Sequence, residues 1–274
     1  MSLSDGWSVV AKKDKKRKTN GRLRVSNAAT VRNMTGDIGY SSIDHVESEV
    51  DAFTDADKEL CKQKIHGLVD KLRHTDFYGK LVDVLKDNVF KDIVCYGVGS
   101  FATGSAPMWQ FACILELRDS LAVENVYYYD PCTTALELEL LKVFKIRVIS
   151  ENERGLRPVS VPTFFYMPHC AQFLYNNVLV SNWKSLDMMV MFGNSLHQYD
   201  GKPGRPLLKA IEMLLPFVGE EVLDCSKRDL QEHFQLEYAF NDCRVLRVEM
   251  ASDFELSALP PVESHQIEND LEVI

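Results

Sequence analysis

Paired cysteines and long apolar runs are both missing from this chain of 274 residues. Its seven cysteines are scattered and include no Cys-x-x-Cys pair, a pattern typical of proteins from a reducing compartment. No apolar stretch approaches the ~20 residues of a membrane-spanning helix, and residues 1–10 lack the apolar centre of a secretory signal. These absences predict a soluble intracellular protein with no role inside a membrane.

Glycine and proline are also scarce, with 14 and 10 residues, whereas 46% of the chain is hydrophobic. Such a composition predicts a substantial packed core, divided into one large domain or two small ones.

Basic residues are scarce outside one segment. Residues 12–24 hold eight Lys or Arg and one acidic residue, whereas the rest of the chain carries 23 basic and 39 acidic residues, a net charge of −16. A core this acidic repels a phosphate backbone, so we do not expect nucleic acid to be its partner. The segment from Lys12 to Lys18 is typical of nuclear-import signals and predicts a protein of both cytoplasm and nucleus. The alternative for this segment is a solubilising arm.

Three regions follow from the pattern along the chain. Residues 1–48 have little hydrophobic periodicity and predict a disordered basic arm, and the acidic residues 251–274 predict a mobile tail. Between them, residues 51–250 predict an α/β domain. It begins with two amphipathic helices over 55–72, with Thr54 as the N-cap, and 77–85.

From residue 93 onward, apolar strands alternate with helices. The predicted strands are 93–96, 126–129, 146–149, 163–166 and 188–192, and the predicted helices are 105–118, 135–144, 170–178 and 207–215. A weaker pattern follows, with a strand near Val222, a helix over 229–236 and a strand over 245–248. This alternation predicts a Rossmann-like three-layer α/β fold with a mainly parallel sheet and a helical N-terminal lead-in.

A glycine-containing turn after the first strand is the most informative motif. Gly97, Gly99 and Ser100 follow the strand, and Gly104 precedes the next helix, where backbone amides can approach a ligand. The spacing is GxGxxxxG, with the third glycine two positions later than in the dinucleotide fingerprint. The glycines indicate either a ligand-binding loop, including one of the methyltransferase type, or a tight strand-to-helix turn.

Polar residues follow three further strands at the edge where parallel sheets place their sites. Asp130 ends the second strand and is a candidate for binding ribose hydroxyls, although Asp before Pro also opens ordinary loops. His169 follows the fourth strand and Asn194 the fifth. The spacing does not support a Ser195–His169–Asp130 triad, and no second ligand beside His169 supports a metal site. We therefore assign no catalytic and no metal-binding residue, and the sequence names no cofactor.

These same stretches carry a family resemblance. They include the turn from Tyr96 to Phe101, the segments 129–131, 150–155, 166–170 and 181–183, and Gly193-Asn194-Ser195. In this order they resemble the domain of the SRR1-like (sensitivity to red light reduced) proteins, and residues 6–10 before a basic run resemble the N-terminus of that family. The resemblance implies a regulatory protein in circadian clock input, in regulation of haem biosynthesis, or in both, and it supplies no catalytic residues.

Three functions fit the sequence. The first is a non-enzymatic regulator that binds an unidentified small ligand or protein partner. The second is a nucleotide- or S-adenosylmethionine-dependent enzyme, in which Gly97 and Gly99 approach the cofactor, Asp130 holds ribose, and His169 or Asn194 faces the substrate. The third is a scaffold whose sheet edge is vestigial and tolerates substitutions throughout.

Overall fold

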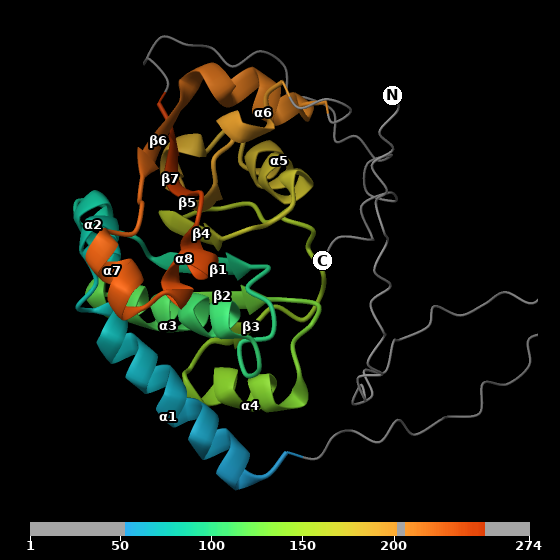
Figure 1. Ribbon diagram of the computed structural model, residues 1–274. Coiled ribbons are helices and arrows are strands. Elements are labelled where there is room, and N and C mark those ends of the chain that lie inside the picture. The colour runs from blue at the N-terminus through green and yellow to red at the C-terminus, as the bar shows by residue number, and fades with distance from the viewer. Residues whose placement is uncertain (1–52, 202–205, 250–274) are drawn as a thin grey trace, which may run out of the picture. The chain divides into compact units, whose positions relative to one another are not determined.

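The computed structural model describes residues 53–201 and 206–249, and within them a seven-stranded sheet is the central element (Figure 1). The strands are β1 (Asp92–Tyr96), β2 (Asn125–Tyr129), β3 (Arg147–Val148), β4 (Thr163–Met167), β5 (Met189–Asn194), β6 (Val218–Val222) and β7 (Cys243–Val248). Their order is β3-β2-β1-β4-β5-β7-β6. The first five strands pair in parallel, and β7 runs antiparallel to both β5 and β6. The predicted α/β fold with a mainly parallel sheet is confirmed.

Helices cover both faces of the sheet. They are α1 (Asp55–Leu72), α2 (Asp76–Leu85), α3 (Ser105–Ser120), α4 (Ala135–Val143), α5 (Gln172–Ser181), α6 (Lys209–Leu214), α7 (Lys227–Glu232) and α8 (Gln235–Phe240). Alternate side chains of β1 show the layers, since Ile93 and Cys95 pack with α1, α3 and α4, and Val94 and Tyr96 pack with α5 and α6. Figure 1 shows α5 and α6 on one side of the sheet and α3 and α4 on the other. Burial on both faces explains why the central strands are continuous apolar runs.

The helical lead-in is joined to the C-terminal part of the domain by one buried carboxylate. Asp229 of α7 accepts hydrogen bonds from the backbone N–H groups of Asp76 and Phe77, both at 2.9 Å. It also completes the capping box of its own helix with Ser226. These bonds satisfy the free N–H groups at the start of α2. One side chain therefore caps two helices that are far apart in the sequence.

Two predicted elements need correction. The helix predicted over 229–236 is two helices, because His233 has a non-helical backbone (φ −141°, ψ 64°) that ends α7 and allows α8 to pack its buried residues on α3. The strand predicted over 146–149 is only β3, since Ile146 and Ile149 lie outside it. The first difference reflects packing of α8 on distant elements, which local patterns do not contain.

Several predictions lie outside the described residues. They concern the basic arm over 1–48, the import segment at Lys12 to Lys18 and the acidic tail over 251–274. Within the described residues, no helix combines enough length with enough apolar character to cross a membrane.

Candidate functional site

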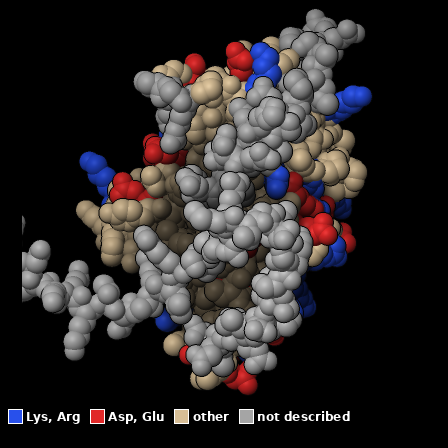
Figure 2. Space-filling model, turned by 90° about the vertical axis from the view of Figure 1, so that its right-hand side faces the viewer, with Lys and Arg blue, Asp and Glu red and all other residues tan. Residues whose placement is uncertain are grey.

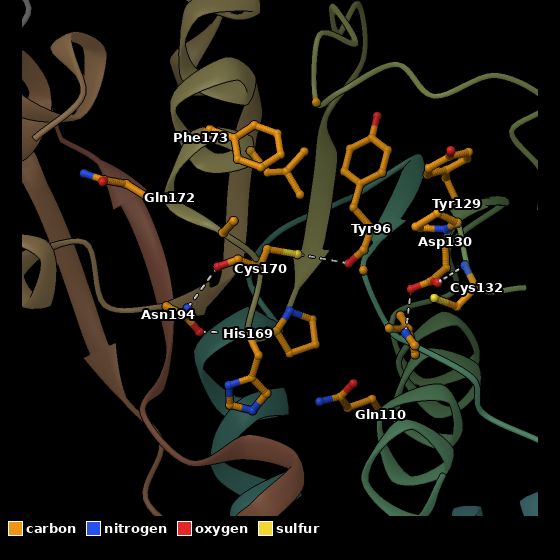
Figure 3. Close-up of a pocket in the computed structure, with 18 of the residues that line it drawn as sticks. Tyr96, Gln110, Tyr129, Asp130, Cys132, His169, Cys170, Gln172, Phe173 and Asn194 are labelled. Carbon is orange, nitrogen blue, oxygen red and sulfur yellow. Dashed lines mark hydrogen bonds between the residues drawn. The ribbon is translucent and has the colours of Figure 1, made fainter. Parts of the chain in front are cut away.

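A cavity of about 920 Å³ opens at the carboxyl ends of β1, β2, β4 and β5 (Figure 3). The strand order reverses between β1 and β4, so the cavity lies at the topological switch point, where open α/β sheets bind their ligands. Its volume is within the range of small-molecule sites, about 300–1,000 Å³. The sequence candidates among its lining residues are Gly97, Gly99, Asp130, His169 and Asn194. Ser100 is not among them.

The glycine turn has the backbone that the sequence indicates. Gly97 and Gly99 have φ values of +66° and +82°, in the left-handed region that favours glycine. A Cβ at Gly97 would lie 2.7 Å from Sγ of Cys170, so the turn packs directly against the loop that follows β4. The third glycine, Gly104, is the N-cap of α3 and would bring a Cβ to 2.9 Å from the carbonyl oxygen of Ser100.

Asp130 holds this turn through both of its carboxylate oxygens. Oδ2 accepts a hydrogen bond of 2.6 Å from the backbone N–H of Gly99, and Oδ1 accepts one of 2.7 Å from that of Cys132. The side chain is almost fully buried, with 6% exposed. Its role as a ribose ligand stays a prediction, because the contacts present in the structure are to the protein's own backbone.

Glu137 of α4 supports the same turn and is the main residue that sequence reasoning missed. Its Oε1 accepts hydrogen bonds from the backbone N–H of Ala102 at 2.7 Å and from the hydroxyl of Ser100 at 2.8 Å. Its Oε2 accepts from the N–H and hydroxyl of Thr134, forming a capping box. The Thr-x-x-Glu spacing was a visible signal of the cap. The contacts to the glycine turn are tertiary and left no signal in the sequence.

His169 lies in the loop between β4 and α5 with a left-handed backbone, φ +57°. Its ring nitrogen Nε2 contacts the carbonyl oxygen of Ala239 in α8 at 3.1 Å, and the side-chain amide of Gln110 donates to the same oxygen at 2.8 Å. Burial lowers the pKa of His169, so the neutral imidazole is favoured and its Nε2–H donates to this carbonyl. The residue thus connects the cavity wall to α8.

Asn194 fixes the end of β5 to the loop after β4. Its Oδ1 accepts from the backbone N–H of His169 at 3.0 Å, and its Nδ2 donates to the carbonyl oxygen of Cys170 at 3.2 Å (Figure 3). The backbone N–H of Asn194 donates to the hydroxyl of Tyr175, which itself donates to the carbonyl oxygen of Met167 at 2.5 Å. These bonds set the spacing of two neighbouring strand ends at the cavity.

An ion pair contacts Tyr96, one of the residues that line the cavity. Arg157 makes two hydrogen bonds with Glu153, at 2.6 and 2.8 Å, and Glu153 accepts a third from the hydroxyl of Tyr96 at 2.7 Å. The guanidinium of Arg157 also lies 4.9 Å from the ring centre of Tyr127. Burial is the main cause that raises the pKa of Tyr96, so its hydroxyl remains protonated beside the carboxylate.

The residues of the conceivable Ser–His–Asp triad do not meet. The hydroxyl of Ser195 donates to Glu220 at 2.6 Å, whereas His169 contacts Ala239 and Asp130 accepts from Gly99. Within residues 53–201 and 206–249, no group of three or more His, Cys, Asp or Glu is placed to hold a metal ion.

Comparison with known proteins identifies the family. The family model of the SRR1 domain matches residues 68–247, which include the glycine turn, the candidate residues at the strand ends and all seven strands except the last residue of β7. The chain belongs to the SRR1 family. The expected resemblance is therefore confirmed.

Three SRR1-family relatives show how far the similarity extends. The chain is 36% identical to the mouse SRR1-like protein over 132 residues, covering 46% of this chain and 52% of that protein. It is 30% identical to Arabidopsis thaliana Protein SENSITIVITY TO RED LIGHT REDUCED 1 over 156 residues, covering 51% and 57%. The Drosophila melanogaster SRR1-like protein is 24% identical over 199 residues, covering 69% and 68%. The chain spans little more than half the length of the first two relatives.

Solved structures resemble this SRR1 domain only weakly. The 23S rRNA methyltransferase ErmE has a TM-score of 0.36 at 13% identity, covering 72% of this chain and 71% of that one. The plantazolicin methyltransferase BpumL has a TM-score of 0.29 at 8% identity, covering 72% and 92%. Values this low do not bear on function.

The first prediction concerns the support of the glycine turn. Glu137→Gln replaces one acceptor oxygen with an N–H₂ group that faces existing donors, so we expect the free energy of unfolding to fall by about 2 kcal/mol. Glu139→Gln, which removes a charge from the same helix at an exposed pair with Lys142, is the control and should cost under about 1 kcal/mol. Chemical denaturation measures both. Equal losses in the two variants would contradict the assigned role of Glu137.

The second prediction concerns pH. Because burial lowers the native pKa of His169 below the value of ~6.5 in an unfolded chain, the unfolded state binds this proton first as pH falls. The stability from neutral His169 is fully present above about pH 6.5 and is lost as pH falls through the lower native pKa. Denaturation from about pH 7.5 to 5 should show a steeper loss for the wild-type chain than for His169→Asn, which tolerates the left-handed backbone. Identical pH profiles would refute this assignment.

Proposed function

We propose that this SRR1-family chain is a regulatory protein whose α/β domain responds to a small molecule bound in the switch-point cavity. The observation that carries the proposal is the cavity itself, formed where the glycine turn, the Asp130 loop and the loop after β4 converge. The side chains of Asp130, His169 and Asn194 are engaged in holding these loops together. A site built in this way suits binding that changes the relative position of its loops.

The family indicates the process in which we propose that this regulation takes place. The name of the Arabidopsis relative refers to sensitivity to red light, and a regulatory role fits it. For this chain we propose a role in circadian clock input, in control of haem biosynthesis, or in both. A protein partner that recognises the ligand-bound domain completes the proposal.

The third prediction tests the cavity with a blocking variant. Ala171 lines the cavity at the N-cap of α5 with an extended backbone, so Ala171→Trp fills space without strain in the chain. Ala135→Trp, at the exposed first position of α4, is the matched control. Thermal denaturation of the full chain is measured with S-adenosylmethionine, NAD(P), ATP and haemin. At 100 times its dissociation constant, a true ligand adds about 2.7 kcal/mol to the free energy of unfolding of the wild-type chain and of the Ala135→Trp control.

The same variants decide whether binding matters in cells that lack the endogenous protein. We expect Ala135→Trp to restore the rhythm of clock-gene transcripts or the level of haem-synthesis transcripts, and a folded Ala171→Trp to fail. Full restoration by a folded Ala171→Trp would refute a regulatory role of the cavity. Release of S-adenosylhomocysteine from S-adenosylmethionine by the purified chain would contradict the non-enzymatic role and support the enzyme alternative.

The fourth prediction concerns location. We propose that the chain enters the nucleus as well as occupying the cytoplasm, because residues 12–18 carry six basic side chains. Replacing Lys15, Lys16, Arg17 and Lys18 with Ala should shift a fluorescently tagged chain towards the cytoplasm. An unchanged nuclear fraction would return the segment to a solubilising role.

A further inference from the structure

The glycine turn and the start of α3 occupy the place where dinucleotide-binding domains hold a pyrophosphate. In those domains the backbone N–H groups of the turn and of the first helical residues point at the phosphates, and the helix dipole favours their negative charge. The turn from Gly97 to Gly104 joins β1 to the 16-residue helix α3 in the same position. The ligand that the cavity can hold therefore depends on the acceptors that these N–H groups already contact.

The protein's own carboxylates receive two of these N–H groups. Asp130 accepts from Gly99 at 2.6 Å, and Glu137 accepts from Ala102 at 2.7 Å (Figure 3 shows the first). Both side chains are buried, Glu137 completely, so their charges are weakly screened by solvent. The negative charges that face these N–H groups of the turn therefore belong to the protein's own side chains.

Two further N–H groups of the turn are engaged, and one near the start of α3 is missing. Gly97 donates to the carbonyl oxygen of Tyr129 at 3.2 Å, and Gly104 donates to that of Ser100 at 2.9 Å. The third residue of α3 is Pro107, which has no N–H to offer at the cavity wall. The usual set of phosphate donors is therefore reduced on both sides of the turn.

The charge of the cavity points the same way. Among the described residues that line it, none is Lys or Arg, and Asp130 is acidic. A phosphate placed at the turn would lie next to the carboxylate that Gly99 already binds, and no cation among the described lining residues would offset the repulsion. Figure 2 shows another side of the molecule, with Lys and Arg side chains at several places around the outline of that view.

The remaining lining suits a neutral or cationic heteroaromatic molecule. Tyr129 and Phe173, both partly exposed, line the cavity together with Asp130 (Figure 3). Aromatic side chains stack on bases, and the lining amides of Gln110 and Asn152 offer donors and acceptors for base edges or hydroxyl groups.

We infer that the cavity takes a nucleoside-type ligand without phosphate groups, in the chemical class of adenosine and S-adenosylmethionine, and that it discriminates against nucleotides. This inference rests on the proposed function of the cavity and names the ligand class of the same site. Asp130 and Glu137 are positioning residues, because they act through the backbone of the turn.

The fifth prediction compares ligands that differ by their phosphates. Isothermal titration of the full chain uses adenosine against AMP as the matched pair, and S-adenosylmethionine against ATP and NAD⁺ as the second set, at one ionic strength. We expect adenosine and S-adenosylmethionine to bind at least ten-fold more tightly than AMP, ATP and NAD⁺. Ala171→Trp should abolish binding of both nucleosides.

A variant without the charge of Asp130 separates charge repulsion of the phosphate from the effect of cavity shape. Asp130→Asn keeps one acceptor oxygen for the turn and removes the charge, so the ratio of AMP to adenosine affinity should rise at least three-fold. Glu139→Gln removes one charge from the exposed side of α4 and should leave the ratio unchanged. If Asp130→Asn does not fold, the wild-type ligand series decides the question alone.

The outcomes test the ligand class and the proposed function separately. AMP or ATP binding in the cavity as tightly as adenosine would overturn the ligand class and leave the proposed regulation by a small molecule standing. No binding of any nucleoside or nucleotide would overturn the ligand class. A folded Ala171→Trp that also restores function in cells would overturn the proposed function itself.

Discussion

Two buried carboxylates under one glycine turn set the shape of the site. Asp130 comes from the end of β2 and Glu137 from the first turn of α4, and both accept hydrogen bonds from the segment between β1 and α3. Burying a carboxylate costs free energy unless hydrogen-bond donors face it, and a tight turn costs free energy if its buried N–H groups lack acceptors. Here the N–H groups of the turn and the two carboxylates supply each other's partners. The position of α3, which packs against α1 and α8, depends on this arrangement.

The opposite wall is held by neutral groups. Asn194, Tyr175 and the backbone of His169 connect the ends of β4 and β5, and the ring of His169 reaches α8 through Ala239. A ligand in the cavity would touch loops from four strands and one residue of α8, Tyr238, which is 70% exposed. Changes at the cavity can therefore reach a surface that a partner protein is able to contact, which is what a regulatory role requires.

Local patterns predicted most of the elements because each one is specified by nearby residues. Thr54 begins α1 through its own capping box, and the apolar run of β4 is buried on both faces of the sheet. The break between α7 and α8 could not be predicted in this way. Residues 229–236 have the periodicity of one helix, and only the packing of Leu236 and Phe240 in the main core places the break at His233.

The sequence by itself determined the family, the α/β class and the edge where polar residues gather, because these depend on residue type, periodicity and motif spacing. Only the tertiary structure decided what those residues contact. Asp130 lies next to Gly99, which is 31 positions earlier, and Glu137 lies next to Ser100 and Ala102, and no spacing in one chain encodes such contacts. Parallel pairing of β1 with β2 brings them together, since it places the carboxyl ends of both strands at one edge.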